Sequence, residues 1–249
     1  MRHEIFRVRH ELIVRSLTVR SRQYVTPKML RLVLTGPELE GFKSLSADDH
    51  IKVFAFDSAG RVERRDYTPR HFDVSRNELT VDFAMHEAGP VTNWAREAVV
   101  GDAAKIGGPR GSVVLPEDFD WWLLIGDETA LPAIGRRLGD LSRGTNVTTM
   151  VSVSGPEEEQ VFATKTNHEA VWVHRPLSQA DDPSLLMKAL EKFQMPTGDG
   201  FIWIAAEAGV CRALREFVLS VMRHPLQWHK ASGYWVQGKA DANEKFELT

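Results

Sequence analysis

The feature that most constrains the fold is a change of rhythm near the middle of the chain. From about residue 11 to 107, short runs of alternating apolar and polar residues are separated by turn residues, as in "MLRLVLTG" and "ELTVDFAMH". This spacing is typical of an antiparallel barrel or sandwich. After residue 116 the pattern becomes strand, helix, strand, which predicts a parallel sheet covered by helices. We therefore expect an antiparallel β-barrel followed by an α/β domain.

The two patterns meet near residues 111–120, where Pro116 and a run of acidic residues separate them. This junction predicts one domain over residues 1–115 and a second over residues 116–249. The polar tail after residue 238 is expected to be mobile or to fold over a site when something is bound.

Composition excludes several classes of protein. The formal charge of −3 argues against a nucleic-acid binder, which needs a clustered excess of Lys and Arg. A single cysteine, Cys211, excludes an intramolecular disulfide, and the nine histidines show no metal-ligand spacing, so no protein-bound metal is expected. The start lacks the apolar run of a secretory signal, and no later stretch is long enough to span a membrane. These features predict a cytoplasmic protein with no membrane partner.

The tract "RRDYTPRHFD", residues 64–73, offers an unusual set of side chains within what is expected to be a strand. Arg65 and Tyr67 would lie on one face and Thr68 on the other, presenting a cation, a flat aromatic face and a hydroxyl. A planar guanidinium suits phosphate oxygens, and an aromatic face suits a flat heterocycle. The alternative is a solvated hairpin arm with ordinary strand aromatics.

A second tract, "DFAMHEAGPVTNWA", contains a Gly-Pro turn that leads into a helix. Such a turn presents backbone N–H groups and the Thr92 hydroxyl to a diphosphate. The helix is predicted to end at Gly101, with Val91, Trp94 and Ala98 on its buried side. Plain helix capping is the alternative explanation for Thr92 and its neighbour Asn93.

With these tracts in this order, the chain resembles the flavin reductases of the ferredoxin-reductase superfamily. It is most similar to their ferric-siderophore reductase branch, the siderophore-interacting proteins, over nearly its whole length, including "DDHIKVF", "GPRGSVVLPEDFDWWLLIGDETALPAI" and "FIWIAAEAGVCRALREF". The resemblance implies that Arg65 grips the pyrophosphate of FAD, Tyr67 packs on the isoalloxazine ring, and Thr68 lies near its N5 atom. It also implies cofactor contacts at Arg70, Asp82, His86, Gly89, Pro90, Val91 and Thr92. Because the family's pattern often has glycine where this chain has Glu87, His86 is equally well explained as a packed strand-end residue.

The nicotinamide nucleotide is expected in the second domain. The signature G-x-G-x-x-G is missing from "IGDETALPAIGRR", as in the family resembled, so we expect the nucleotide to lie across this loop and the turn at residues 205–209. Gly126 would allow a tight turn and Thr129 would cap the helix. The expected contacts are Asp127, Thr129, Ala206 and Glu207, although acids at helix starts also favour the helix dipole.

The choice between NADH and NADPH is less constrained. A 2′-phosphate favours an Arg or Lys after the second parallel strand, but "SVSGPEEEQ" supplies acids there, with Lys165 and Arg175 as possible compensation. The resemblance favours NADPH.

For an anionic iron chelate the useful cations are Lys52, Arg110 and Lys239. The resemblance implies that Lys52 and Arg110 line the substrate pocket, whereas solvated surface cations are the alternative, above all for Lys239.

The function implied is that of a cytoplasmic reductase passing electrons from NAD(P)H through FAD to Fe(III) in a ferric siderophore, with no side chain acting as acid or base. A general flavin reductase and a non-catalytic ferric-siderophore carrier remain alternatives. An external electron donor such as a ferredoxin also remains open.

Overall fold

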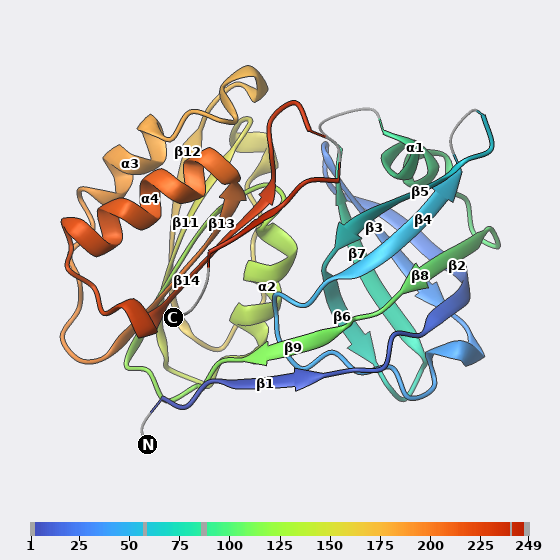
Figure 1. The fold of residues 1–249 in the computed structure, drawn as a ribbon, viewed down its shortest axis with the longest axis horizontal. Helices are drawn as coiled ribbons and strands as arrows, with labels where there is room; N and C mark the ends of the chain where they lie inside the picture. The colour runs from blue at the N-terminus through green and yellow to red at the C-terminus, as the bar shows by residue number, and fades with distance from the viewer. Residues whose placement is uncertain (1–2, 57–58, 86–88, 240, 247–249) are drawn as a thin grey trace. The chain divides into compact units, whose positions relative to one another are not determined.

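The computed structural model describes residues 3–56, 59–85, 89–239 and 241–246 (Figure 1). The chain divides into two compact units. The first comprises Met1–Pro116 with Gly135–Arg137, and the second comprises Glu117–Ile134 with Leu138–Thr249. Among the described residues, no helix has both the length and the apolar character that crossing a bilayer requires.

The first unit is built on a seven-stranded antiparallel sheet that curls into a half-barrel, which confirms the antiparallel prediction (Figure 1). Its strand order is β5-β4-β8-β2-β3-β7-β6. The bounds are β2 (Val14–Thr26), β3 (Met29–Thr35), β4 (Ile51–Phe56), β5 (Val62–Tyr67), β6 (Pro69–Asp73), β7 (Glu78–Ala84) and β8 (Ala103–Gly107).

A separate pair, β1 (Phe6–Arg9) and β9 (Gly111–Val114), runs antiparallel and was not expected. Every residue of β1 is exposed, so the strand carries no buried face that alternation could reveal.

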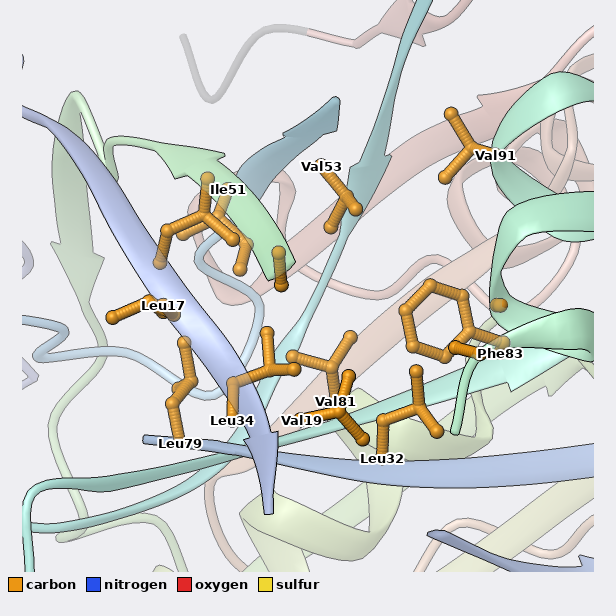
Figure 2. Packing of buried hydrophobic residues seen from close by; sticks show 14 of the residues in the cluster. Leu17, Val19, Leu32, Leu34, Ile51, Val53, Leu79, Val81, Phe83 and Val91 are labelled. Carbon is orange, nitrogen blue, oxygen red and sulfur yellow. The ribbon is translucent and has the colours of Figure 1, made fainter. Parts of the chain in front are cut away.

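Alternation within the strands builds the core of the first unit. In β3, Leu30, Leu32 and Leu34 are fully buried, and the residues between them are only partly so. Their side chains meet those of β2 and β7, as Figure 2 shows for Leu17 and Phe83 among others. Each such burial contributes about 1.5–3 kcal/mol relative to exposure.

The helix of the first unit, α1 (Pro90–Glu97), ends earlier than the predicted Gly101. Ala98 has extended backbone angles, and the two valines that follow it are exposed. Valine loses side-chain freedom in a helix, and the Val99 N–H donates instead to the Asp102 carboxylate at 2.9 Å. Val91 and Ala98 are buried as predicted, and Trp94 is partly buried and packs against the core; Ala95 is also fully buried.

The second unit has a six-stranded sheet of order β12-β11-β10-β13-β14-β15. The first five strands are parallel, as predicted, and β15 is antiparallel to β14. Helices α3 and α4 cover one face and α2 lies on the other (Figure 1). The bounds are β10 (Trp121–Asp127), α2 (Leu131–Asp140), β11 (Asn146–Val153), β12 (Asn167–His174), α3 (Ser184–Leu190), β13 (Gly200–Glu207), α4 (Ala208–Ser220), β14 (His229–Trp235) and β15 (Glu244–Lys245).

The order of strands in this sheet reverses at one point. From the central β10 the chain winds outward through β11 to β12, and then returns to the other side of β10 to form β13 and β14. In doubly wound sheets, ligands bind beyond the carboxyl ends of the strands at the point where the order reverses. Here that point lies between the ends of β10 and β13.

Candidate functional site

Two of the predicted flavin tracts come together in the first unit. Tyr67 ends β5, and its ring packs against Phe83 of β7 with centroids 4.4 Å apart. The Tyr67 hydroxyl forms a hydrogen bond with the side chain of Thr92 on α1. Burial raises the pKa of Tyr67 to about 12, so the phenol stays neutral at physiological pH. The aromatic residue and the hydroxyl singled out from sequence are therefore direct neighbours.

The tract 64–73 is not one strand but two, because β5 ends at Tyr67 and β6 begins at Pro69. Thr68 forms the joint and is buried. Pro69 lacks the N–H that a continuing strand would donate, which favours a break at this point. The Thr68 hydroxyl is consequently held at a strand junction rather than on a strand face.

Arg65 lies on β5 with its side chain 27% exposed. One guanidinium nitrogen donates both to Glu63, at 2.9 Å, and to the carbonyl of Arg64, at 2.7 Å. The group is therefore anchored at one end and accessible, as a phosphate ligand needs to be.

Arg70 is half-buried on β6. Asp82 is almost completely buried, and its two carboxylate oxygens accept from the Arg31 guanidinium at 2.6 and 2.7 Å. This bidentate pair joins β3 to β7 and was not expected from sequence. The cofactor contacts at Arg70 and Asp82 stay predictions, and His86 lies outside the described residues.

The start of α1 has the properties of an anion site. Gly89, the N-cap, has no side chain with which to cap the helix, and Pro90 has no N–H. The Asn93 N–H donates to the Gly89 carbonyl at 2.8 Å, which is the first hydrogen bond of the helix. The N–H groups of Val91 and Thr92 precede it, at the helix start, where backbone donors have no partner within the helix. A Cβ placed on Gly89 would meet no described atom within 4 Å, so the backbone is open to a ligand. This open helix start beside Thr92 fits a diphosphate.

Of the two predicted substrate cations in the first unit, Lys52 lies in the sheet and Arg110 lies in the segment between β8 and β9. Lys52 of β4 pairs in register with Gly107, the last residue of β8, and Arg110 follows three residues later. The Lys52 ammonium lies 3.0 Å from the Asp66 carboxylate, whereas Arg110 is exposed. Lys239 belongs to the second unit, where it is exposed and its N–H donates to the Val236 carbonyl.

A network of hydrogen bonds around Asp49, three residues before Lys52, was not predicted from the sequence. The buried Asp49 carboxylate accepts from the hydroxyls of Ser112, at 2.6 Å, and Ser44, at 2.8 Å. The Ser112 oxygen is also 2.8 Å from the His10 ring. The network fixes the loop before β4 to β9 and so supports Lys52. Serines close before an aspartate are a turn signal that could have indicated it.

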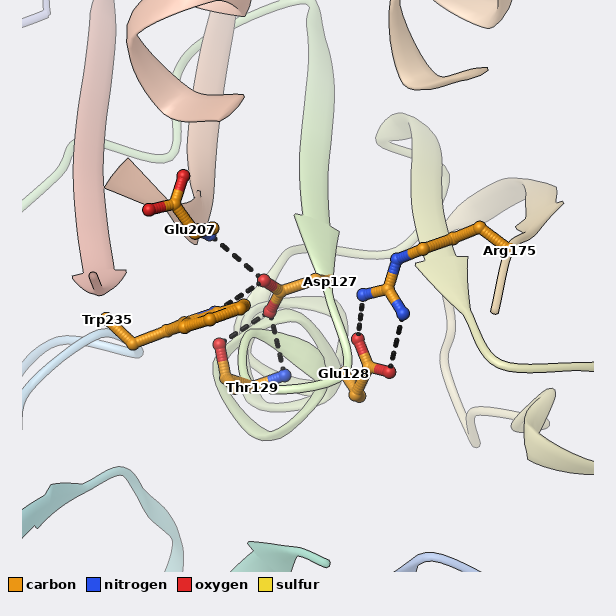
Figure 3. Close-up of polar contacts among 6 residues, drawn as sticks. All are labelled: Asp127, Glu128, Thr129, Arg175, Glu207 and Trp235. Carbon is orange, nitrogen blue, oxygen red and sulfur yellow. Dashed lines mark hydrogen bonds and ion pairs between the residues drawn. The ribbon is translucent and has the colours of Figure 1, made fainter. Parts of the chain in front are cut away.

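At the carboxyl edge of the second sheet, Asp127 accepts four hydrogen bonds (Figure 3). One oxygen accepts from the backbone N–H and hydroxyl of Thr129, at 2.9 and 2.5 Å. The other accepts from the Glu207 N–H at 3.0 Å and from the Trp235 indole N–H at 2.8 Å. Asp127 therefore ties together the ends of β10, β13 and β14, and its predicted contact with nucleotide stays a prediction.

Gly126 is required by close packing rather than by a tight turn. A Cβ there would lie 2.5 Å from the Ala130 Cβ and 2.7 Å from the Ala205 carbonyl oxygen. The start of α2 and strand β13 thus approach the backbone of β10 more closely than any side chain allows.

Glu207 is the N-cap of α4, as the helix-start alternative predicted. One carboxylate oxygen accepts from the N–H groups of Gly209 and Val210, and the other accepts from the Gln237 N–H at 3.2 Å. The neighbouring Ala206 is buried, and its N–H donates to the Cys211 sulfur. Burial raises the pKa of the Cys211 thiol, which makes it an unreactive core group.

Glu128 and Arg175 form an ion pair at the same carboxyl ends of the strands (Figure 3). The two guanidinium nitrogens donate to the two carboxylate oxygens at 3.1 and 2.5 Å, and the Arg175 side chain is 4% exposed. Burial raises the pKa of Glu128, the negative charge of Asp127 raises it further, and Arg175 opposes both.

Comparison with known proteins identifies the family of the chain. Residues 119–238 match the family described as siderophore-interacting protein, and residues 18–63 and 54–113 match the siderophore-interacting FAD-binding domain. The NADPH-dependent ferric-chelate reductase of Escherichia coli (strain K12) is 33% identical over 250 residues, which cover 92% of this chain and 95% of that protein. Ferric vibriobactin reductase ViuB of Vibrio cholerae is 29% identical over 239 residues, 88% of each chain.

Solved structures show the same likeness. A siderophore utilization protein from T. fusca superposes with a TM-score of 0.90 at 32% identity, covering 96% of this chain and 98% of that one. The ferredoxin-NADP+ reductase from Plasmodium falciparum, at 12% identity, a TM-score of 0.61 and coverage of 82% and 89%, shares the fold. The chain therefore belongs to the siderophore-interacting protein family.

Proposed function

We propose that this protein is a ferric-siderophore reductase that binds FAD non-covalently, takes electrons from NAD(P)H and reduces Fe(III) in a bound chelate. The observation that carries the proposal is the contact of Tyr67 with Thr92 beside the open start of α1. It joins an aromatic face, a hydroxyl and backbone donors within the unit that matches an FAD-binding domain. The reductase names of the relatives support the same reaction.

In this proposal residues 1–115 hold FAD. The N–H groups of Val91 and Thr92 and the Arg65 fork bind the diphosphate, since each offers donors to phosphate oxygens. Tyr67, whose ring is backed by Phe83, supports the flat ring, and Thr68 presents its hydroxyl from the strand junction.

Residues 116–249 hold the nicotinamide nucleotide at the carboxyl edge of the sheet. When bound, FAD supplies the conversion between a two-electron hydride donor and two one-electron transfers to ferric ions. The protein's side chains position the reactants and move no proton in this scheme.

Lys52, Arg110 and Lys239 attract the chelate, because ferric siderophores of the catecholate type are anionic. Ferrous iron is held less tightly than ferric iron by hard oxygen ligands, so reduction releases the metal. Because the reaction consumes NAD(P)H, we place it in the cytoplasm, with the nucleotide rather than a ferredoxin as donor.

The test is an anaerobic absorption experiment on the purified full chain. We expect a flavin spectrum that NADPH or NADH bleaches, that a ferric siderophore restores, and that yields two ferrous ions per nucleotide in a ferrous-specific dye assay. Bleaching without ferrous iron would instead indicate a general flavin reductase. A chain that changes neither flavin colour nor iron valence would be a carrier.

A further inference from the structure

The ion pair between Glu128 and Arg175 spans an unusual distance across the second sheet. Glu128 directly follows β10 and Arg175 directly follows β12, with β11 between these two strands. Neighbouring strands lie about 4.8 Å apart, so the two side chains together cross roughly 10 Å over the carboxyl end of β11. The Arg175 N–H donates to the carbonyl of Val153, the last residue of β11, at 3.0 Å. The guanidinium therefore lies over the end of the second strand of this unit.

This position has a known chemical meaning in dinucleotide folds. The adenosine ribose lies beyond the second strand, where an acid accepts from a free 2′-hydroxyl or an arginine binds a 2′-phosphate. Here β11 is followed by the turn Pro156–Glu158 and by Glu159, which pairs with His174 at 2.8 Å. The chain segment after β11 is thus acidic, and Arg175 brings a guanidinium to it from the next strand.

Lys165, the other cation considered from sequence, lies at the opposite end of the strands, just before β12 begins. Its carbonyl accepts from the Gly144 N–H at 3.0 Å, just before β11 and β12 begin. The eight residues of β12 rise about 3.3 Å each, which places roughly 25 Å between the two ends. Lys165 therefore cannot meet the same phosphate as Arg175.

We propose that Arg175 recognises the 2′-phosphate of NADPH and that Glu128 competes with this phosphate for the guanidinium, so that the pair sets the preference between NADPH and NADH. The inference rests on the proposed binding of nicotinamide nucleotide by this unit. A guanidinium binds phosphate and carboxylate through the same pair of parallel hydrogen bonds, so the exchange of partners loses neither bond. Burial and the negative charge of Asp127 disfavour the charged form of Glu128 and raise its pKa, whereas Arg175 favours that form.

Titration calorimetry on the full chain with two probes tests the proposal. The probes are adenosine 2′,5′-bisphosphate and 5′-AMP, which differ only in the 2′-phosphate. We expect Arg175→Gln to weaken binding of the bisphosphate at least tenfold and to leave 5′-AMP within about twofold, since one bidentate charged contact is lost. Glu128→Gln should tighten binding of the bisphosphate severalfold without changing 5′-AMP. Lys165→Gln, which removes the same charge from the other end of the strands, should leave the ratio of the two affinities unchanged.

Opposite effects from the two partners separate recognition from mere structural support, which would weaken both probes in both variants. Because Arg175→Gln leaves a buried carboxylate without its partner, the double variant Glu128→Gln/Arg175→Gln provides a second route, and it should show the same loss of preference. Equal changes for both probes would overturn the inference and leave the proposed function standing. Binding of neither probe to the natural chain would overturn the nucleotide role itself, and the inference with it.

Discussion

Lys52 and Arg110 differ in how much of their charge the protein itself balances. The Lys52 ammonium contacts Asp66 at 3.0 Å, and both side chains are about a quarter exposed, at 29% and 24%. Ion pairs of this exposure contribute only about 0–1 kcal/mol, so an incoming anion can share the ammonium at little cost. Arg110 is exposed, lies directly before β9, and follows by three residues Gly107, which pairs with Lys52 at the start of β4.

Replacing either cation tests the substrate site. We expect Lys52→Ala and Arg110→Ala each to raise KM for an anionic ferric chelate about fivefold at low salt, since a charge contact in water is worth about 1 kcal/mol. The effect should shrink as salt rises. Steady-state kinetics with the chelate and with a neutral quinone make the comparison, and Lys105→Ala, on β8, is the control. Equal losses with both acceptors would contradict the substrate role.

Single residues were predictable where chemistry and sequence neighbourhood coincide. Tyr67 and Thr92 were singled out because each belongs to a short tract with a recognisable composition. The bonds of Asp127 to Trp235, 108 positions away, and to Glu207, 80 positions away, could not be predicted, because only the folded sheet brings these strand ends to one edge.

At the scale of elements, hydrophobic rhythm predicted where strands and helices lie but not where they stop. Helix α1 ends at Glu97 because an aspartate side chain captures a backbone N–H that follows it. The tract after Arg64 divides at Thr68 because proline cannot donate to the neighbouring strand. Both boundaries depend on hydrogen bonds that periodicity does not encode.

The contact of β10 with α2 and β13 gives a prediction for two glycines. Gly126→Ala should destabilise the chain by about 1–3 kcal/mol, because the new methyl overlaps Ala130 and the Ala205 carbonyl. Gly139→Ala, within α2 and with no described atom inside 4 Å, should instead stabilise it by about 0.5–1 kcal/mol. Urea unfolding measures both, and effects of the same sign would refute the packing argument.

Two buried histidines, His224 before β14 and His229 at its start, predict that the free energy of unfolding falls at acid pH. Burial lowers the pKa of both His224 and His229 below the ordinary 6.5. Between these lowered values and 6.5 the unfolded chain binds more protons than the folded chain, so stability is present above pH 6.5 and is lost as pH falls below it. Unfolding free energies measured at stepwise pH should show this loss, and His229→Gln should reduce its slope. A slope that the variant leaves unchanged would contradict the assignment.

At the scale of the whole molecule, the fold class followed from the change of rhythm and from the resemblance together. The antiparallel and parallel sheets are both present as predicted. The pair of β1 with β9 was missed, because every residue of β1 is exposed and the one buried residue of β9 is Ser112, so neither strand buries an apolar face.

Cofactor binding should also appear as stability of the whole chain. FAD at a hundred times its Kd should add about 2.7 kcal/mol to the free energy of unfolding. Arg65→Ala should weaken FAD binding about 10- to 100-fold, since a hydrogen bond to a charged group is worth about 1.5–3 kcal/mol. Arg64→Ala, next to it on the opposite face of β5, is the matched control. Fluorescence titration and thermal unfolding give both quantities, and equal losses from the two variants would exclude a specific grip by Arg65.

The four donors around Asp127 have a consequence for the energetics of the reaction cycle. Trp235 and the backbone at Glu207 are immobilised when the chain folds, so their loss of conformational freedom is complete before a reactant arrives. In the proposed function, an incoming nucleotide would meet a preorganised rim and give up only its own motion. Its release would likewise need no refolding of that rim, which suits a step that the proposed reaction repeats in every turnover.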